Sequence, residues 1–305
     1  MHKKPINVYT LLGHSDSVFF DMSLSCLKSF CAHCKDDYKL IILEDGTLTI
    51  SDKDVLQKSL HKLTIVSDSD TREQVSDLIY KYPYISKYRK SKQVLARKLI
   101  DIPLLSKEDY CYIDSDIYFI RDFSGINRTL IENEDFVNMQ DYQNAYFLSF
   151  YELHLSKNRI KLPAKVNTGM LFVRKNKFSL DIIENYLKLF ELNFTKPKPV
   201  DSWRYNLIEQ TCWAALSTHI NSYYWDPRQV YIPINKNVIT KNTIALHFVS
   251  RLRHLFEKIV EKSNKIKDSD IVELNTIPIK YSNIFKNFTT VIKNKFLNYN
   301  RLKNG

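Results

Sequence analysis

The sequence has few of the residues that make flexible or low-complexity chains. Only 5 of its 305 residues are glycine and 9 are proline, which argues against a linker-rich protein. No stretch approaches the roughly eighteen consecutive apolar residues of a membrane span. The N-terminal residues MHKKPINVYTLLG also lack the long apolar core of a signal peptide. We therefore expect a globular cytoplasmic protein whose contact with membranes is at most peripheral.

Cysteine is scarce, and its number is odd. The five cysteines are Cys26, Cys31, Cys34, Cys111 and Cys212. Two of them fall inside apolar patterns, which fits free thiols in a reducing compartment. The motif CAHC at 31–34 has the spacing of a metal or redox pair. Because no second pair follows at zinc-finger spacing and the motif ends an amphipathic helical pattern, we assign it a structural role.

Positive charge is in surplus. The chain has 45 Lys and Arg against 34 Asp and Glu, a net charge of +11. This surplus favours anionic partners, such as nucleotide phosphates, acidic glycans, anionic lipid or nucleic acid, without choosing among them. Hydrophobic residues make up 44% and aromatic residues 13%, enough for a large core.

Hydrophobic periodicity predicts an α/β fold. Buried strands are expected at 6–13, 38–46 and 62–66, with helices at 17–34 and 52–60 between them. Strands that alternate with helices at this spacing indicate a mostly parallel sheet covered by helices on both faces. Further strands are expected at 109–113, 135–141, 167–176 and 242–249, and further helices at 91–105, 178–192 and 206–217.

The character of the chain changes near residue 255, where Lys-rich helical sequence begins. We therefore divide it into a main domain, 1–254, and a basic helical C-terminal segment, 255–305. The last helical face carries Phe285, Phe288, Ile292, Phe296 and Tyr299. Such a face can rest on an anionic membrane, form an oligomer contact or pack on the body of the protein, and packing is preferred. The stretch TKPKPVDSWR at 195–204 has the composition of a loop.

Two carboxylates interrupt an apolar run in DYCYIDSDIYFIRD, residues 109–122. If the run is a buried strand, Asp114 and Asp116 lie where the chain leaves the sheet, and two acids there suit a divalent cation. The alternative is a surface turn whose acids face water. A third ligand can come from ALHFVSRLRH at 245–254, because His247 ends another predicted strand. Arg251, Arg253 and His254 follow it, and arginine suits phosphate oxygens.

With these motifs in order, the sequence resembles the GT-A glycosyltransferases, most closely those of family 8. The resemblance extends from about residue 6 to residue 254. It rests on YIDSDIYF with its Asp-x-Asp, on VNTGMLFV at 166–173, on the pair Glu209–Gln210 and on HFVSRLR at 247–253. It implies a GT-A (Rossmann-like) fold with a mixed, mostly parallel sheet.

The resemblance also implies roles for individual residues. Metal ligands would be Asp114, Asp116 and His247. Donor-binding residues would be Arg97, Ser115, Asp141 and Arg253, with Arg97 approaching sugar and phosphate and Asp141 holding sugar hydroxyls. Catalytic residues would be Asn167, Glu209 and Gln210, beside the anomeric carbon.

Some positions depart from the family pattern. Ser250 stands where the family has glycine, and Arg253 where it has lysine. The acid–Gln pair is Glu-Gln rather than Asp-Gln, and the first strand lacks the common T-x-D-x-x-Y. For base and ribose, the end of the first strand is the expected site, because such sheets bind ligands beyond the carboxyl ends of their strands. Tyr9, Thr10 and Leu11 are the candidates there, with ordinary strand packing as the alternative.

The activity implied is transfer of a hexose from a nucleotide diphosphate sugar, with UDP favoured, and retention of configuration. The cofactor would be Mn²⁺ or Mg²⁺, and the acceptor a glycan, a glycolipid or a protein side chain. An inverting reaction stays open, with Glu209 or Asp226 as base.

Two other classes rank lower. A phosphatase or phosphotransferase of the haloacid dehalogenase kind also uses Asp-x-Asp, but usually on its first strand. A non-catalytic nucleic-acid binder would concentrate Lys and Arg on a recognition element. Only the tail and KYRKSKQVLARK at 87–98 are dense in them, so we expect no nucleic-acid partner.

Overall fold

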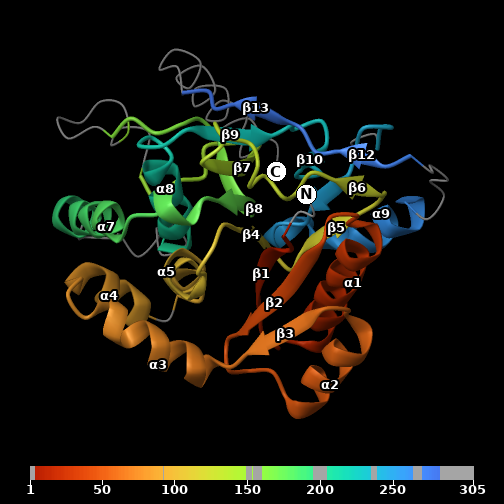
Figure 1. Ribbon diagram of the computed structural model, residues 1–305, viewed down its shortest axis with the longest axis horizontal. Helices are drawn as coiled ribbons and strands as arrows, with labels where there is room; N and C mark the ends of the chain where they lie inside the picture. The colour runs from red at the N-terminus through yellow and green to blue at the C-terminus, as the bar shows by residue number, and fades with distance from the viewer. Residues whose placement is uncertain are drawn as a thin grey trace, which may run out of the picture.

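A computed structural model shows how these patterns fold, and it describes residues 4–91, 93–148, 153, 160–194, 205–234, 239–263 and 270–281. Within these residues eight strands form a central sheet in the order β13-β9-β7-β8-β4-β1-β2-β3 (Figure 1). Four of its seven pairings are parallel, namely β9 with β7, β4 with β1, β1 with β2 and β2 with β3. The prediction of a mixed, mostly parallel α/β sheet is confirmed.

The strands of the central sheet are β1 (Ile6–Leu12), β2 (Tyr38–Glu44), β3 (Leu63–Val66), β4 (Tyr110–Ile113), β7 (Phe136–Gln140), β8 (Val166–Val173), β9 (Ser222–Trp225) and β13 (Thr276–Pro278). Two small sheets flank it. One has the order β10-β11-β5, and the other pairs β12 with β6. Their strands are β5 (Ile117–Phe119), β6 (Phe123–Ser124), β10 (Val230–Tyr231), β11 (Ala245–His247) and β12 (Val272–Glu273).

Helices cover both faces of the central sheet (Figure 1). Helices α1 and α2 pack on one face, and α3, α4, α5, α7 and α8 pack on the other. The helices are α1 (Ser17–His33), α2 (Ile50–Ser59), α3 (Asp68–Ile79), α4 (Pro83–Lys90), α5 (Leu95–Leu105), α7 (Leu180–Phe194), α8 (Ile208–Leu216) and α9 (Phe256–Ser263). Because both faces are covered, β4 and β8 are buried along their whole length, and β4 is a continuous apolar run.

Local sequence explains where several helices begin. Asp16 caps α1, since its side chain accepts a hydrogen bond from the backbone N–H of Phe19 at 2.7 Å. Thr49 and Asp52 form a capping box at the start of α2. Pro83 occupies the first turn of α4, where its missing N–H leaves no hydrogen bond unmade.

The segment after residue 254 also adds strands to the fold. Helix α9 follows a 3₁₀ helix at Ser250–Leu255. Strand β13 then pairs with β9 in the central sheet, and β12 pairs with β6. These two short strands differ from the purely helical segment expected, and the domain boundary at 254 stays a prediction. The apolar face at 285–299 and the loop at 195–204 lie outside the described residues. None of the described helices is long and apolar enough to cross a lipid bilayer.

The five cysteines are free thiols, and four of them are buried. Burial raises the pKa of Cys34 to about 12. His33, within the CAHC motif, has its Nδ1 2.9 Å from a carboxylate oxygen of Asp122. At the end of α1, the motif therefore places Cys34 in the core and pairs His33 with Asp122.

Candidate functional site

The two acids lie where β4 ends. Strand β4 stops at Ile113, and β5 begins at Ile117. Between them the backbone N–H of Asp114 donates to the carbonyl of Gly169 on β8 at 2.6 Å. The carbonyl of Asp114 accepts from the N–H of Ile117 at 3.2 Å, which closes a tight turn. The prediction that the apolar run is a strand ending at its acids is confirmed.

His247 comes to the acids through strand pairing. Strand β11 runs antiparallel to β5, with His247 opposite Ile117. The Nε2 atom of His247 lies 3.0 Å from Oδ1 of Asp116 and 3.4 Å from Oδ2 of Asp114. The N–H of Phe248 donates to the carbonyl of Asp116 at 2.9 Å and fixes the same approach. One ligand atom from each of the three side chains lies within 4.8 Å of the others.

The orientation of His247 suits a metal ligand. The Oδ1 atom of Asn167 accepts from the backbone N–H of Gly169 at 2.9 Å and lies 3.2 Å from Nδ1 of His247. The Nδ2 atom of Asn167 donates to Asp141 at 3.2 Å. Since Oδ1 of an amide only accepts, Nδ1 of His247 carries the proton, and Nε2 faces the carboxylates. Such a partner on the far nitrogen is typical of metal-bound histidine. Two carboxylates and one imidazole nitrogen fit Mn²⁺, and also Mg²⁺ with added water.

The three groups are electrostatically linked. Burial would lower the pKa of His247, but the carboxylates of Asp116 and Asp114 outweigh it and raise that pKa. Burial would raise the pKa of Asp116, but His247 and Arg253 outweigh it and lower that pKa. The two carboxylates therefore concentrate negative charge, which His247 and Arg253 partly offset, and such a concentration attracts a divalent cation.

Two cations flank the acids. Nη2 of Arg253 donates to Oδ2 of Asp116 at 3.1 Å, and its guanidinium lies 4.3 Å from the ring centre of Phe19. On the other side Nζ of Lys98 donates to Oδ1 of Asp114 at 3.1 Å. The side chain of Lys98 is only 2% exposed. The site thus presents fixed positive charge on both sides of the acids.

A cleft of about 240 Å³ opens at these acids, beyond the carboxyl ends of β1, β2 and β4. Five of the predicted residues line it, namely Leu11, Asp114, Ser115, Asp116 and Arg253. Gly13, Phe19 and Asp45 also line it. Its position agrees with the rule that open α/β sheets bind ligands at this edge.

Tyr9 and Thr10 are buried in the strand rather than in the lining of this cleft. Tyr9 packs edge-on against Tyr110, with ring centres 5.6 Å apart. Burial raises the pKa of the Tyr9 hydroxyl. Thr10 is fully buried, and its hydroxyl has no hydrogen-bond partner among the described residues. Their role toward base and ribose stays a prediction.

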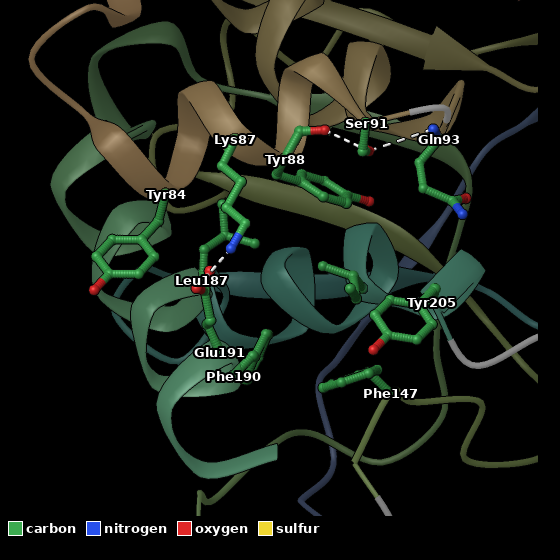
Figure 2. Close-up of a pocket in the computed structure, with 11 residues that line it drawn as sticks. Tyr84, Lys87, Tyr88, Ser91, Gln93, Phe147, Leu187, Phe190, Glu191 and Tyr205 are labelled. Atoms are coloured by element: carbon green, nitrogen blue, oxygen red, sulfur yellow. Dashed lines mark hydrogen bonds and ion pairs between the residues drawn. The ribbon is translucent and has the colours of Figure 1, made fainter. Parts of the chain in front are cut away.

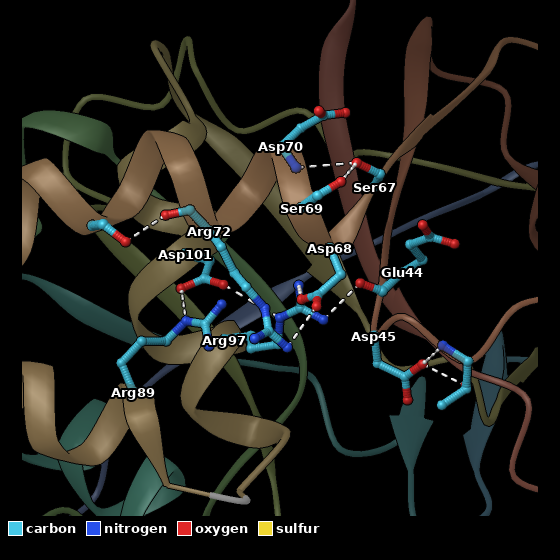
Figure 3. A network of polar contacts seen from close by, with 12 residues as sticks. Glu44, Asp45, Ser67, Asp68, Ser69, Asp70, Arg72, Arg89, Arg97 and Asp101 are labelled. Carbon is cyan, nitrogen blue, oxygen red and sulfur yellow. Dashed lines mark hydrogen bonds and ion pairs between the residues drawn. The ribbon is translucent and has the colours of Figure 1, made fainter.

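Arg97 is held in a buried polar network rather than in the cleft lining (Figure 3). Its Nη1 donates to the carbonyl of Glu44 at 2.6 Å, its Nε donates to Asp101 at 3.3 Å, and its Nη2 binds Asp68. Nε of Arg89 donates to the other oxygen of Asp101 at 2.6 Å. The network ties the end of β2 to α3 and α5. The approach of Arg97 to sugar and phosphate stays a prediction.

The predicted catalytic residues lie on β8 and α8. Asn167 contacts Asp141 and His247, as described above. Glu209 accepts a hydrogen bond from Oγ1 of Thr168 at 3.0 Å, and its carboxylate lies 3.8 Å from Nζ of Lys98. Burial raises the pKa of Glu209 to about 7, although Lys98 opposes the shift. Gln210 donates to the carbonyl of Ala145 at 2.6 Å. The structure thus links Asn167 directly to His247, and Glu209 through Lys98 to Asp114.

Sequence reasoning missed Lys98 and Tyr112. The hydroxyl of Tyr112 donates to Oδ1 of Asp114 at 2.6 Å, and Nζ of Lys98 lies 4.3 Å from the Tyr112 ring centre. The two-residue period of a strand places Tyr112 on the same side as Asp114, and that signal could have identified it. Lys98 follows Arg97 directly on a helix, where neighbours point about 100° apart, so the sequence alone did not show which cation faces the acids.

An aromatic cavity of about 370 Å³ lies between α4, α7 and the start of α8 (Figure 2). Its aromatic lining comprises Tyr84, Tyr88, Phe147, Phe190 and Tyr205. Lys87 and Glu191 form an ion pair of 2.7 Å beside it. The hydroxyl of Tyr88 has no hydrogen-bond partner among the described residues. Ile208, which precedes Glu209, also lines this cavity.

Comparison with known proteins gives similar solved structures at very low sequence identity. No protein-family model matches the sequence, and no curated protein matches it. The galactosyltransferase LgtC, solved with donor and acceptor sugar analogues, is similar with a TM-score of 0.47 and 9% identity, over 87% of this chain and 98% of that chain. Mouse xyloside xylosyltransferase 1 in its apo form has a TM-score of 0.47 and 9% identity, over 80% and 98%. An active-site mutant of LgtC has a TM-score of 0.44 and 10% identity, over 90% and 98%.

Proposed function

We propose that this chain is a metal-dependent glycosyltransferase of the GT-A, family 8 type. It would transfer a hexose from a nucleotide diphosphate sugar, with UDP favoured, to a hydroxyl of a glycan, glycolipid or protein. The observation that carries the proposal is the group of Asp114, Asp116 and His247 at the mouth of a cleft, flanked by Arg253 and Lys98. A cation site beside fixed positive charge suits a diphosphate, which is a concentrated anion.

The three side chains would hold Mn²⁺ or Mg²⁺, whose charge stabilises a diphosphate leaving group without a proton. Arg253 lines the same cleft, and its guanidinium, which lies over Phe19, would bind incoming phosphate oxygens. Leu11 at the end of β1 lines the other wall, so the nucleoside would lie along Leu11 and Gly13. Ser115 completes this donor site in the proposal, and Tyr9 and Thr10 would support the base and ribose from within β1.

In the reaction, the bond between the anomeric carbon and the diphosphate oxygen breaks, and both of its electrons stay on that oxygen. The acceptor hydroxyl oxygen forms the new bond to the anomeric carbon, and its proton passes to the leaving diphosphate. Asn167, Glu209 and Gln210 would stabilise the positive charge that develops on the sugar, which is electrostatic catalysis. Asp141, bonded to Asn167, would hold sugar hydroxyls. We expect retention of configuration without a covalent intermediate between sugar and enzyme.

The position of the acids in the chain favours this proposal over a haloacid dehalogenase-like phosphatase. The Asp-x-Asp follows β4, the fourth strand of the chain, whereas those phosphatases usually mount it on the first strand. Asp116 is also bonded to Arg253, and Asp114 to Lys98, so two cations lie beside the acids where a diphosphate would bind.

The test is release of nucleoside diphosphate from a panel of UDP- and GDP-sugars, with Mn²⁺, with Mg²⁺ and with EDTA. We expect slow, metal-dependent hydrolysis of one donor, and loss of it in Asp116→Asn. The matched control is Asp54→Asn, because Asp54 is an exposed acid of α2. Release that EDTA or Asp116→Asn leaves intact would contradict the metal assignment. If no sugar nucleotide of the panel releases nucleoside diphosphate and calorimetry detects no donor binding, the transferase proposal is contradicted.

A further inference from the structure

A second cavity, of about 690 Å³, reaches Asp141, one of the residues proposed to bind the donor. We call it the basic cavity, because Lys165, Arg228 and Lys241 line it. It lies beyond the end of β7, between the segments that flank β10. Asp141 lines it and accepts the hydrogen bond from Asn167, whose Oδ1 contacts His247. A molecule in this cavity would therefore lie beside the residues proposed to hold the donor sugar.

Positive charge predominates in the described lining of the basic cavity. Asp141 is the one acid among those lining residues, and it already accepts hydrogen bonds from Asn167 and from the N–H of Gln143. Lys165 and Lys241 form no ion pair with any described residue. Their ammonium groups would therefore attract an anion that enters the cavity.

The cationic residues are held in place by their surroundings. Lys165 has a φ of 60°, in the left-handed region where glycine or asparagine is less strained than lysine. Its carbonyl accepts from the N–H of Asp141 at 2.6 Å, and its N–H donates to Oδ1 of Asn144 at 2.8 Å. Backbone strain held in this way clusters at binding and catalytic sites.

The turn that carries Lys241 is also fixed. The buried guanidinium of Arg121 donates to the carbonyl of Thr243 at 2.6 Å and to that of Thr240 at 3.0 Å, and it also binds the carbonyl of Lys241. Nε of Arg228 lies 3.0 Å from both carboxylate oxygens of Asp226, so its guanidinium has a defined direction. These contacts pre-organise the cavity before any ligand arrives.

The remaining lining suits a sugar ring. Tyr142, Tyr231 and Ile232 provide apolar surface against which the C–H face of a saccharide can pack. The aromatic cavity of Figure 2 has one lining cation, Lys87, which is paired with Glu191. In the basic cavity Arg228 is likewise paired, with Asp226, but Lys165 and Lys241 have no such partner among the described residues. The basic cavity is therefore the better place for a charged saccharide.

We propose that the acceptor is a saccharide bearing a phosphate or carboxylate group, and that this anion binds Lys165, Arg228 and Lys241 in the basic cavity. This inference rests on the proposed function, and names the substrate class of its acceptor side. Both anions have oxygen acceptors that match the forked donors of arginine and the ammonium of lysine.

The test measures binding to the full-length protein saturated with Mn²⁺ and UDP, so that the donor phosphate site is filled. Glucose and galactose, their 6-phosphates and the two uronic acids are titrated by calorimetry. We expect at least one charged sugar to bind about tenfold more tightly than its neutral parent. The Lys165→Gln/Lys241→Gln double variant should lose that preference while it still binds UDP. The 6-phosphate and uronate arms show which anion is preferred.

The control removes the same charge from another part of the surface. Lys39 on β2 and Lys58 on α2 are exposed, and the Lys39→Gln/Lys58→Gln variant should keep the preference for the charged sugar. Equal binding of charged and neutral sugars, no binding of any charged sugar, or equal losses in both double variants would each overturn the inference. UDP binding is measured first, so its absence in the wild type would instead overturn the proposed function.

Discussion

Gly169 leaves the space that the ring of His247 occupies. A Cβ atom on Gly169 would lie 2.4 Å from both Nδ1 and Cε1 of His247, far inside van der Waals contact. The same glycine accepts the backbone hydrogen bond of Asp114 and donates its own N–H to Asn167. Gly169 therefore helps to position three side chains of the site, those of Asp114, Asn167 and His247.

The Gly169→Ala variant should lose metal affinity, because the added methyl group must displace the ring of His247. We expect the dissociation constant for Mn²⁺ to rise at least tenfold, in the range seen when groups that orient metal ligands are removed. Mn²⁺ titration followed by electron paramagnetic resonance measures it. In a His247→Ala background the ring is gone, so adding Gly169→Ala should change the affinity little further. Wild-type affinity in Gly169→Ala alone would contradict this account.

Arg253 should contribute to binding of the diphosphate more than to binding of the metal. Its guanidinium shares the cleft with the acids and stacks on Phe19. We expect Arg253→Gln to raise the dissociation constant of UDP with Mn²⁺ about tenfold, with a weaker dependence on salt. Mn²⁺ affinity without nucleotide should not fall, since the variant removes a cation from beside Asp116. Calorimetry distinguishes the two effects, and a selective loss of metal affinity would be the contrary result.

Much of the fold could be predicted because apolar periodicity is strong in its central elements. Strands β1, β2 and β4 are nearly continuous apolar runs, β8 ends in the apolar run Met170–Val173, and α5 is buried along most of its length. Helix α3 was not predicted, because its buried face consists only of Thr71, Val75 and Ile79 in an acidic segment. Strands β12 and β13 were not predicted either, since segments of two or three residues have no measurable period.

Only part of the candidate site could be predicted from the sequence, because strand ends are visible in the apolar pattern and the rotation of a helix is not. Asp114, Asp116 and His247 each end or follow a strand, and strand ends meet at one edge of a sheet. Whether Arg97 or Lys98 faces that edge depends on the rotation of α5. Packing against the core and the carboxylates of Asp68 and Asp101 set this rotation, and Asp68 lies 29 residues before Arg97 in the sequence.

Arg97 should stabilise the fold. Its guanidinium is nearly buried and binds Asp101, whose side chain is fully buried. Arg97→Gln leaves the carbonyl of Glu44 and one oxygen of Asp101 without their donor, although Arg89 still pairs with Asp101, so the variant should lower the free energy of unfolding by roughly 3 kcal/mol. The matched control is Arg72→Gln, because Arg72 pairs with Asp68 in the same network but is 66% exposed. That exposed pair should contribute less than about 1 kcal/mol. Urea unfolding measures both, and similar losses in the two variants would contradict the assignment.

Glu209 should make stability depend on pH, in the direction opposite to most carboxyl groups. Burial raises its pKa from an ordinary 4.5 to about 7 in the folded chain. Between these values the folded state holds a proton that the unfolded state has released, so the free energy of unfolding falls as pH rises. The contribution is fully present below pH 4.5 and is lost above pH 7.

The measurement compares the wild type with Glu209→Gln, which does not titrate, by urea unfolding in EDTA at pH 5, 6, 7 and 8. Other groups titrate equally in both proteins, so their effects cancel in the difference. Relative to the variant, the wild type should lose on the order of 2 kcal/mol between pH 5 and 7, and only about 0.3 kcal/mol more by pH 8. Thr168 can still donate to the amide oxygen of the variant, which preserves that contact. A difference that stays constant, or that grows in favour of the wild type as pH rises, would mean that Glu209 is ionised throughout.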